Sequence, residues 1–199
     1  MPRIDDYKQA LELGKKALLK KDPDLISRLS GAQLHTDPQG NKKISLFFLN
    51  RAVIITWPEL GFSIKNSHDE VPIQQQILLL HYLDGVGSGT KISEDWIAFQ
   101  DVPDGRFYLG AFLKRAKDPL VKTFGQNPKL LIDGAIKIYD AIPYNHGDFS
   151  VVVKALPLVP VALILWKGDE EFPPEGNILF DRTISDILSA EDIAWLSGM

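Results

Sequence analysis

The chain has 199 residues, of which 45% are hydrophobic and 24% are charged, and its formal net charge is −4. This composition is that of a globular protein and excludes a disordered chain, a collagen-like repeat and a disulfide-rich scaffold. The chain has no cysteine, which excludes disulfides, cysteine-held zinc or iron–sulfur centres and a thiol nucleophile.

Two helices are predicted at the start of the chain. Residues 4–20 place alanines and leucines at helical spacing, with lysines on the opposite face. Asp22-Pro23 is typical of an N-cap followed by proline at the first helical position, so a second helix is expected through Leu29. Gly31 is expected to end it.

A region of strands follows these helices. Short runs rich in β-branched and aromatic residues predict strands at Gln33–Thr36, Lys43–Leu49, Ala52–Trp57 and Gly61–Lys65. Residues 37–41 are a turn sequence, in which Pro38 presets φ and Gly40 supplies a positive φ.

The middle of the chain is predicted to be helical. Ser67 and Glu70 have the spacing of a capping box, which predicts a helix from Val71 that is apolar on more than one side and therefore buried. This helix is expected to stop before the flexible segment 85–89. A second helix is expected over Arg106–Lys117, continuing to Phe124 past a break at Asp118-Pro119.

The last third is predicted to contain strands again. Phe149–Leu156 and Val161–Trp166 have strand composition, and the prolines between them indicate a bulge, a bend or an edge. Trp96–Phe99 is a further short strand candidate, and residues 130–141 are ambiguous between helix and strand. Ser189 is expected to cap a helix that runs through Leu196.

Strands therefore cluster in the first and last thirds, with helices at the N-terminus, in the middle and at the C-terminus. This order predicts an α+β fold with a mainly antiparallel sheet, because alternating βαβ units are missing. The length predicts a single domain over residues 1–199.

The chain carries no sign of a membrane or nucleic-acid protein. The longest apolar run, residues 155–166, is shorter than the roughly 20 residues that a spanning helix needs. The N-terminus does not resemble a signal peptide, so we expect a cytoplasmic protein. The mildly acidic balance argues against a dedicated nucleic-acid-binding protein, which usually carries a basic stripe.

The segment from Leu163 to Asp181 is the most unusual part of the chain, with Glu171-Phe172-Pro173 at its centre. It resembles the prokaryotic family called domain of unknown function 3786, whose hallmark is a Glu-Phe-Pro motif. Residues 79–83 and Trp96-Ile97 also look like that family. The resemblance implies a bacterial or archaeal protein, often from an anaerobe. Some relatives carry an extra iron–sulfur domain, and this chain lacks the cysteines for one.

The same segment is the main candidate for a functional site. Four carboxylates, those of Asp169, Glu170, Glu171 and Glu175, occur within seven residues after Trp166, and the same stretch holds Phe172 followed by two prolines. Crowded carboxylates beside aromatic rings can have raised pKa values and can act as acids, bases or ligands. The plainer interpretation is a strand-end turn that Asp169 caps. The spacing does not match a calcium-binding loop, and no metal is predicted.

Histidines and loops add weaker candidates. No two of the four histidines have the spacing of a zinc-binding helix. His81 is the most interesting, because a polar group on a buried helix needs a partner. A carboxylate–histidine pair would form if the acidic loop met His81. Arg106 could pair with a carboxylate or an anionic ligand.

Further catalytic motifs are missing. The glycine-rich segment 85–91 fails the spacing of a phosphate-binding loop, and no Gly-x-Ser-x-Gly motif supports serine hydrolase chemistry.

Three functions are therefore open. The first is a binding or accessory module for a small molecule, a cofactor of unknown identity or a protein partner. The predicted binding residues for this module are Trp166, Asp169, Glu170, Glu171, Phe172, Asp181 and Arg106. The second is an enzyme that uses carboxylate acid–base chemistry, with Glu170, Glu171 and His81 as catalytic candidates. The third is a homo-oligomeric or scaffold protein that associates through exposed aromatic side chains.

Overall fold

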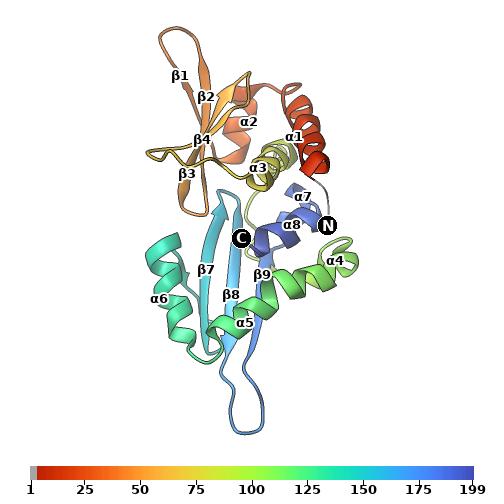
Figure 1. The fold of residues 1–199 in the computed structure, drawn as a ribbon, viewed down its shortest axis with the longest axis vertical. Helices are drawn as coiled ribbons and strands as arrows, with labels where there is room; N and C mark the ends of the chain where they lie inside the picture. Colours follow the sequence, from red (N-terminus) through yellow and green to blue (C-terminus); the bar gives the residue numbers. More distant parts are fainter. Residues whose placement is uncertain (1–3) are drawn as a thin grey trace. The chain divides into compact units, whose positions relative to one another are not determined.

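The computed structural model describes residues 4–199, which pack into two compact units. The first unit extends to Thr90 and takes in Asp186–Leu188 from much later in the chain; the second is formed by Lys91–Ser185 and Ser189–Met199. Figure 1 shows the elements of both units in the colours of the sequence. A single domain over residues 1–199 stays a prediction.

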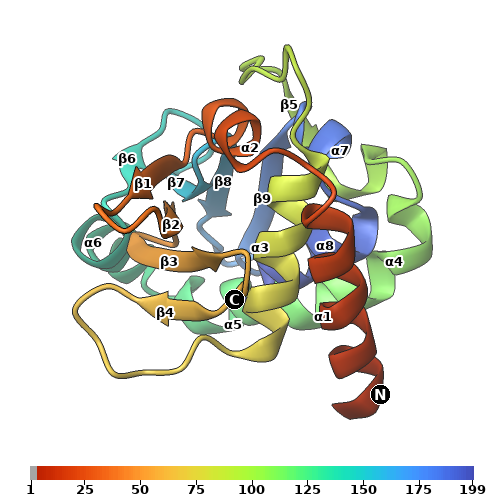
Figure 2. The same ribbon diagram turned by 90° about the horizontal axis from the view of Figure 1, so that it is seen from above.

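The first unit combines helices with an antiparallel sheet. Its helices are α1 (Ile4–Leu18), α2 (Pro23–Ser30) and α3 (Ile73–Gly85). Its strands lie in the order β1 (Gln33–Thr36), β2 (Lys42–Phe48), β3 (Arg51–Trp57) and β4 (Phe62–Ile64). Helices α1 and α3 lie side by side, as Figure 2 shows.

The N-terminal predictions are confirmed because local signals determine these elements. Asp22 caps α2 by accepting the Asp24 N–H, and Gly31 ends the helix at φ 70°. Alternating residues of β2 are buried, with Ile44 and Phe48 fully so. The predicted strands leave residues 50–51 for the turn between them, but the tight turn falls one residue earlier, at Leu49-Asn50. Both residues have the positive φ that a type I′ turn requires.

The capping box predicted at Ser67 is wrong. Residues 67–72 form a loop, α3 begins at Ile73, and Pro72 occupies its N-cap position. The Ser67 hydroxyl instead accepts the Asp69 N–H, two residues away. Proline disfavours helical backbone in the residue before it, so Val71 could not join the helix.

The second unit is built on a five-stranded antiparallel sheet. The strand order is β5 (Trp96–Ala98), β9 (Glu175–Asp181), β8 (Val159–Trp166), β7 (Phe149–Leu156) and β6 (Ile142–Pro143). The pairing of β7 with β8 shifts register between Lys154 and Leu156, which confirms the predicted irregularity near the prolines. Strands β6 and β9 were not predicted.

Helices and turns of the second unit pack on one face of this sheet. They are η1 (Phe99–Asp101), α4 (Gly105–Phe112), η2 (Leu113–Lys117), α5 (Asp118–Phe124), α6 (Pro128–Tyr139) and α8 (Ala190–Ser197). The short α7 (Ile184–Ile187) joins β9 to the C-terminal segment. Phe180 of β9 contacts Phe99 and Phe112, with ring centroids 6.4 and 6.2 Å away, which fixes the face that the helices cover.

The helix predicted over 106–124 is present, but no break occurs at Asp118-Pro119. A π-helical turn, η2, precedes the proline and joins α4 to α5. A proline ring clashes with the carbonyl four residues earlier in a regular helix, and the widened turn relieves that clash. The ambiguous residues 130–141 fall mostly in α6, and Ser189 caps α8 in a full capping box with Asp192.

The α+β class and the antiparallel pairing are confirmed, although the strands of the first and last thirds form two separate sheets. Among the helices of residues 4–199, none combines the length and apolarity needed to cross a membrane.

Candidate functional site

The acidic segment forms the loop of the hairpin between β8 and β9. Trp166 pairs with Glu175 as the last register position, and residues 167–174 extend beyond the sheet. Figure 1 shows this loop as the blue hairpin end of the second unit.

Asp169 holds the hairpin loop in one shape. Its Oδ1 accepts the backbone N–H groups of Phe172 and Glu171, each at 2.8 Å. Its own N–H donates to the Phe172 carbonyl at 2.9 Å. The hydrogen bonds from Phe172 and Glu171 lower the pKa of Asp169, because they favour the charged carboxylate. The predicted turn cap is therefore present.

An open hollow of about 590 Å³ lies between this loop and the corner that joins α5 to α6. Its lining is formed by Gly125, Gln126, Pro128, Lys167, Gly168, Asp169, Glu170, Glu171, Phe172, Pro173 and Pro174. The corner and the loop touch closely, since a Cβ on Gly125 would come within 2.9 Å of the Pro174 ring.

Most charged side chains that line the hollow are acidic, and the lining also includes the large apolar side chain of Phe172. Glu170 and Glu171 are exposed, and Phe172 is 67% exposed. Lys167 is the only cation in the lining, and its ammonium lies 5.0 Å from the centre of the Phe149 ring. An exposed phenylalanine on a loop of fixed shape is a feature of binding surfaces.

Trp166 does not line the hollow. Alternation along β8 directs Leu165 toward the helices, where it lies near Gly176, and directs Trp166 to the opposite face. There the Trp166 ring meets His146, with centroids 6.1 Å apart.

Asp181 lies at the other end of β9, six residues or roughly 20 Å along the strand from Glu175. Its side chain is 1% exposed. The carboxylate accepts both the N–H and the hydroxyl of Ser93, the N–H of Glu94, and both the N–H and the hydroxyl of Thr183. Asp181 therefore fastens the segment before β5 to the end of β9, and it lies apart from the hollow.

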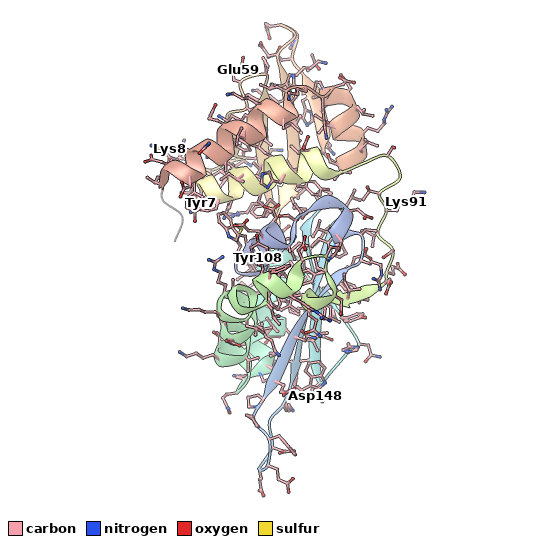
Figure 3. The ribbon with its side chains drawn as sticks, turned by 90° about the vertical axis from the view of Figure 1, so that its right-hand side faces the viewer. Tyr7, Lys8, Glu59, Lys91, Tyr108 and Asp148 are labelled. Carbon is pink, nitrogen blue, oxygen red and sulfur yellow. The ribbon has the colours of Figure 1, made fainter. Side chains whose placement is uncertain are left out.

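Arg106 also lies apart from the hollow. It is exposed in the first turn of α4. The Asp148 carboxylate accepts the Lys167 N–H, so Asp148 marks the start of the hairpin loop. Figure 3 shows that Tyr108, which belongs to the same helix as Arg106, lies far from Asp148 within the unit.

His81 belongs to α3 of the first unit, whereas the hairpin loop belongs to the second. The proposed pair between His81 and a carboxylate of the loop stays a prediction.

Sequence reasoning missed two parts of this region. The corner residues Gly125, Gln126 and Pro128 complete the hollow, and the only signal for them was a glycine and a proline between two helices. Tyr144 and His146 were not among the predicted site residues, although the His146 ring contacts both the Tyr144 ring and the Trp166 ring.

Acid–base chemistry at the hollow would fall to the carboxylates of its loop. Glu170 and Glu171 are exposed at an open hollow. Among the described residues, no group of three or more histidine, aspartate or glutamate side chains is placed to hold a metal ion.

The fold and the site define an α+β protein whose second unit presents an acidic hairpin loop with an exposed phenylalanine. A family model described as Domain of unknown function (DUF3786) matches residues 22–199, and the chain belongs to this family. The match confirms the family predicted from the sequence. No curated protein and no solved structure matches the chain.

Proposed function

We propose that the protein is a binding module that holds a positively charged ligand, either a basic segment of a protein partner or a small cationic molecule, in the hollow beside residues 167–174. The observation that carries this proposal is the side chain of Phe172, which is 67% exposed. It belongs to a carboxylate-rich loop and lines the hollow together with the corner at Gly125. The apolar ring would contact an apolar part of the ligand, and Glu170 and Glu171 would attract its charge.

The fixed shape of the loop supports this role. Asp169 makes its hydrogen bonds to the loop backbone before any ligand arrives, so little conformational entropy would be lost on binding. The carboxylates lie at the rim, where charges contribute more to the association rate and to selectivity than to affinity.

The proposed setting is the cytoplasm of a prokaryote. This proposal rests on the resemblance to the family and on a chain without cysteine.

A titration tests the binding proposal. The full chain is titrated with a capped Lys-Leu-Lys-Leu-Lys peptide, and amide NMR shifts are followed. We expect saturable shifts at Glu170–Phe172 and at Gly125–Gln126. Glu170→Gln combined with Glu171→Gln should weaken binding about threefold to tenfold, since exposed charge pairs contribute little each.

Two controls define the outcome. Glu59→Gln combined with Glu191→Gln removes the same charge at other exposed positions and should leave the affinity unchanged. The peptide Glu-Leu-Glu-Leu-Glu should not bind. Equal binding of both peptides, or equal affinity for the loop variant and the wild type, would overturn the proposal.

A further inference from the structure

The helical run from α4 to α5 carries a row of basic side chains. The run extends from Gly105 to Phe124 through the π-helical turn η2 (Figure 1). It contains five basic residues and one acidic residue, Asp118, although acidic residues outnumber basic ones in the second unit as a whole. We call the five basic residues the basic row: Arg106, Lys114, Arg115, Lys117 and Lys122.

The π-helical turn helps to keep the basic row on one side of the run. Phe112, Ala116 and Leu120 are buried and follow one another at intervals of four residues. A regular α-helix rotates by about 40° over each such interval, and the wider turn η2 reduces that rotation. The same interval, taken twice, leads from Lys114 to Lys122, and both of these lysines are exposed. The run therefore packs one side against the unit and presents its cations on the other.

The cations of the basic row have no ion-pair partner among residues 4–199. The ion pairs of other cations include those of Lys21 with Asp84 and of Arg182 with Asp95. Within the same described part of the chain, the exposed carboxylates of Glu170 and Glu171 form no ion pair either. A surface on which like charges gather attracts a surface of the opposite charge and disfavours other partners.

An exposed aromatic side chain accompanies the basic row, as Phe172 accompanies the acidic loop. Phe107 is 86% exposed, the largest fraction among the exposed large apolar side chains. It follows Arg106 in the sequence, and nothing lies within 4 Å of a Cβ built on Gly110, one turn further along the helix. The outer side of the run is therefore open at Gly110, between Arg106 and Lys114. The Phe172 ring of another molecule would contact Phe107 there and stack on the Arg106 guanidinium.

We propose that the basic row of one copy of the chain binds the hollow and the hairpin loop of a second copy. This inference rests on the proposed function of the hollow and identifies its basic ligand. The two surfaces are opposite in charge, and each adds one exposed aromatic ring, Phe107 or Phe172. A second copy is favoured over an unrelated partner because the same chain supplies both halves of the contact. Each copy carries one loop and one basic row, so two copies bind reciprocally and close as a dimer.

Analytical ultracentrifugation of the full chain tests this proposal. With rising concentration at low salt, we expect the mass to increase from that of one chain to that of two. The dimer should dissociate at about 1 M salt, where the screening length is only about 3 Å. Lys114→Glu combined with Arg115→Glu should weaken dimerisation about tenfold or more, because like charges then face each other. Glu170→Lys combined with Glu171→Lys should weaken it similarly.

Mixing the two charge-reversed variants gives the sharpest test. An equimolar mixture should form the dimer again, because the reversed loop of one variant then faces the reversed basic row of the other in both contacts. Lys65→Glu combined with Lys154→Glu makes the same change of charge at other exposed positions and should dimerise as the wild type does. Circular dichroism checks that each variant is folded.

Three outcomes overturn this inference: a wild type that stays monomeric up to millimolar concentration, folded charge-reversed variants that dimerise as the wild type does, or a mixture of the two variants that stays monomeric. Titration with the Lys-Leu-Lys-Leu-Lys peptide separates this failure from that of the proposed function. A monomeric chain that binds the peptide at the hollow removes only the second copy as its partner. A chain that binds neither the peptide nor a second copy removes both proposals.

Discussion

Two aspartates of the same hairpin show how surroundings decide what a carboxylate does. Asp169 is exposed and shapes the loop through two backbone N–H groups. Asp181 is buried and joins two segments that are nearly 90 residues apart in sequence. Both were predicted to bind a ligand, but only Asp169 lies at the hollow.

Asp181→Asn should destabilise the second unit by about 2–3 kcal/mol, because an amide cannot accept all the donors that face the buried carboxylate. Chemical denaturation followed by tryptophan fluorescence measures this loss. Asp148→Asn, at an exposed carboxylate with one backbone N–H, is the matched control and should cost less. Equal losses for the two variants would contradict the anchoring role.

The same carboxylate should make stability depend on pH. Burial would raise the pKa of Asp181, but the hydrogen bonds from Thr183 and Ser93 outweigh burial and hold the pKa below its usual range. Its contribution is therefore present above the unfolded pKa of about 3.9 and is lost as the pH falls through the lower folded value. The stability difference between wild type and Asp181→Asn should be constant from pH 7 to 5 and shrink below pH 4.

At the scale of the element, replacing either of two helical glycines in the second unit with alanine should change the stability of the protein, in opposite directions for the two positions. A Cβ on Gly105 would lie 2.1 Å from the Phe99 carbonyl oxygen, so Gly105→Ala should cost about 1–3 kcal/mol. Nothing lies within 4 Å of a Cβ on Gly134, so Gly134→Ala should stabilise α6 by about 0.8–1 kcal/mol. Thermal unfolding compares the two, and a lower melting temperature for Gly134→Ala would contradict this packing.

At the scale of the whole molecule, residues 186–188 belong to the first unit, although the residues before and after them belong to the second. A Cβ on Gly85 would come within 2.0 Å of the Ile187 carbonyl oxygen, and the Ile187 side chain is buried. The first unit therefore depends on residues that lie just over 100 positions after the end of its helix α3.

Ile187→Ala in the full chain should lower the hydrogen-exchange protection of α3, with a cost of about 2–5 kcal/mol for the lost side chain. Ile97→Ala, at an equally buried position of the second unit, should instead lower the protection of β9. If both variants lower protection equally throughout the chain, residues 1–199 unfold as the single domain predicted from their length.

Much of the local structure was predictable because its causes lie within a few residues. Asp22-Pro23 and Ser189 start helices through their own hydrogen bonds, and Gly31 ends one through its positive φ. Ser67 shows the limit of such signals, since Pro72 five residues later overrode the capping pattern. Strand β9 was not predicted, because Glu175, Asn177 and Asp181 are polar. The buried positions Gly176, Ile178 and Phe180 therefore did not form a recognisable apolar strand pattern.

The sequence by itself determined most of the helices and strands, the α+β class, the family and the acidic turn after Trp166, because these follow from neighbouring residues or from a continuous motif. Only the tertiary structure decided that the strands form two sheets, that Asp181 is an anchor, that Gly125 completes the hollow and that Trp166 joins Tyr144 and His146. Each of these depends on contacts between residues far apart in the chain, which periodicity and spacing do not encode.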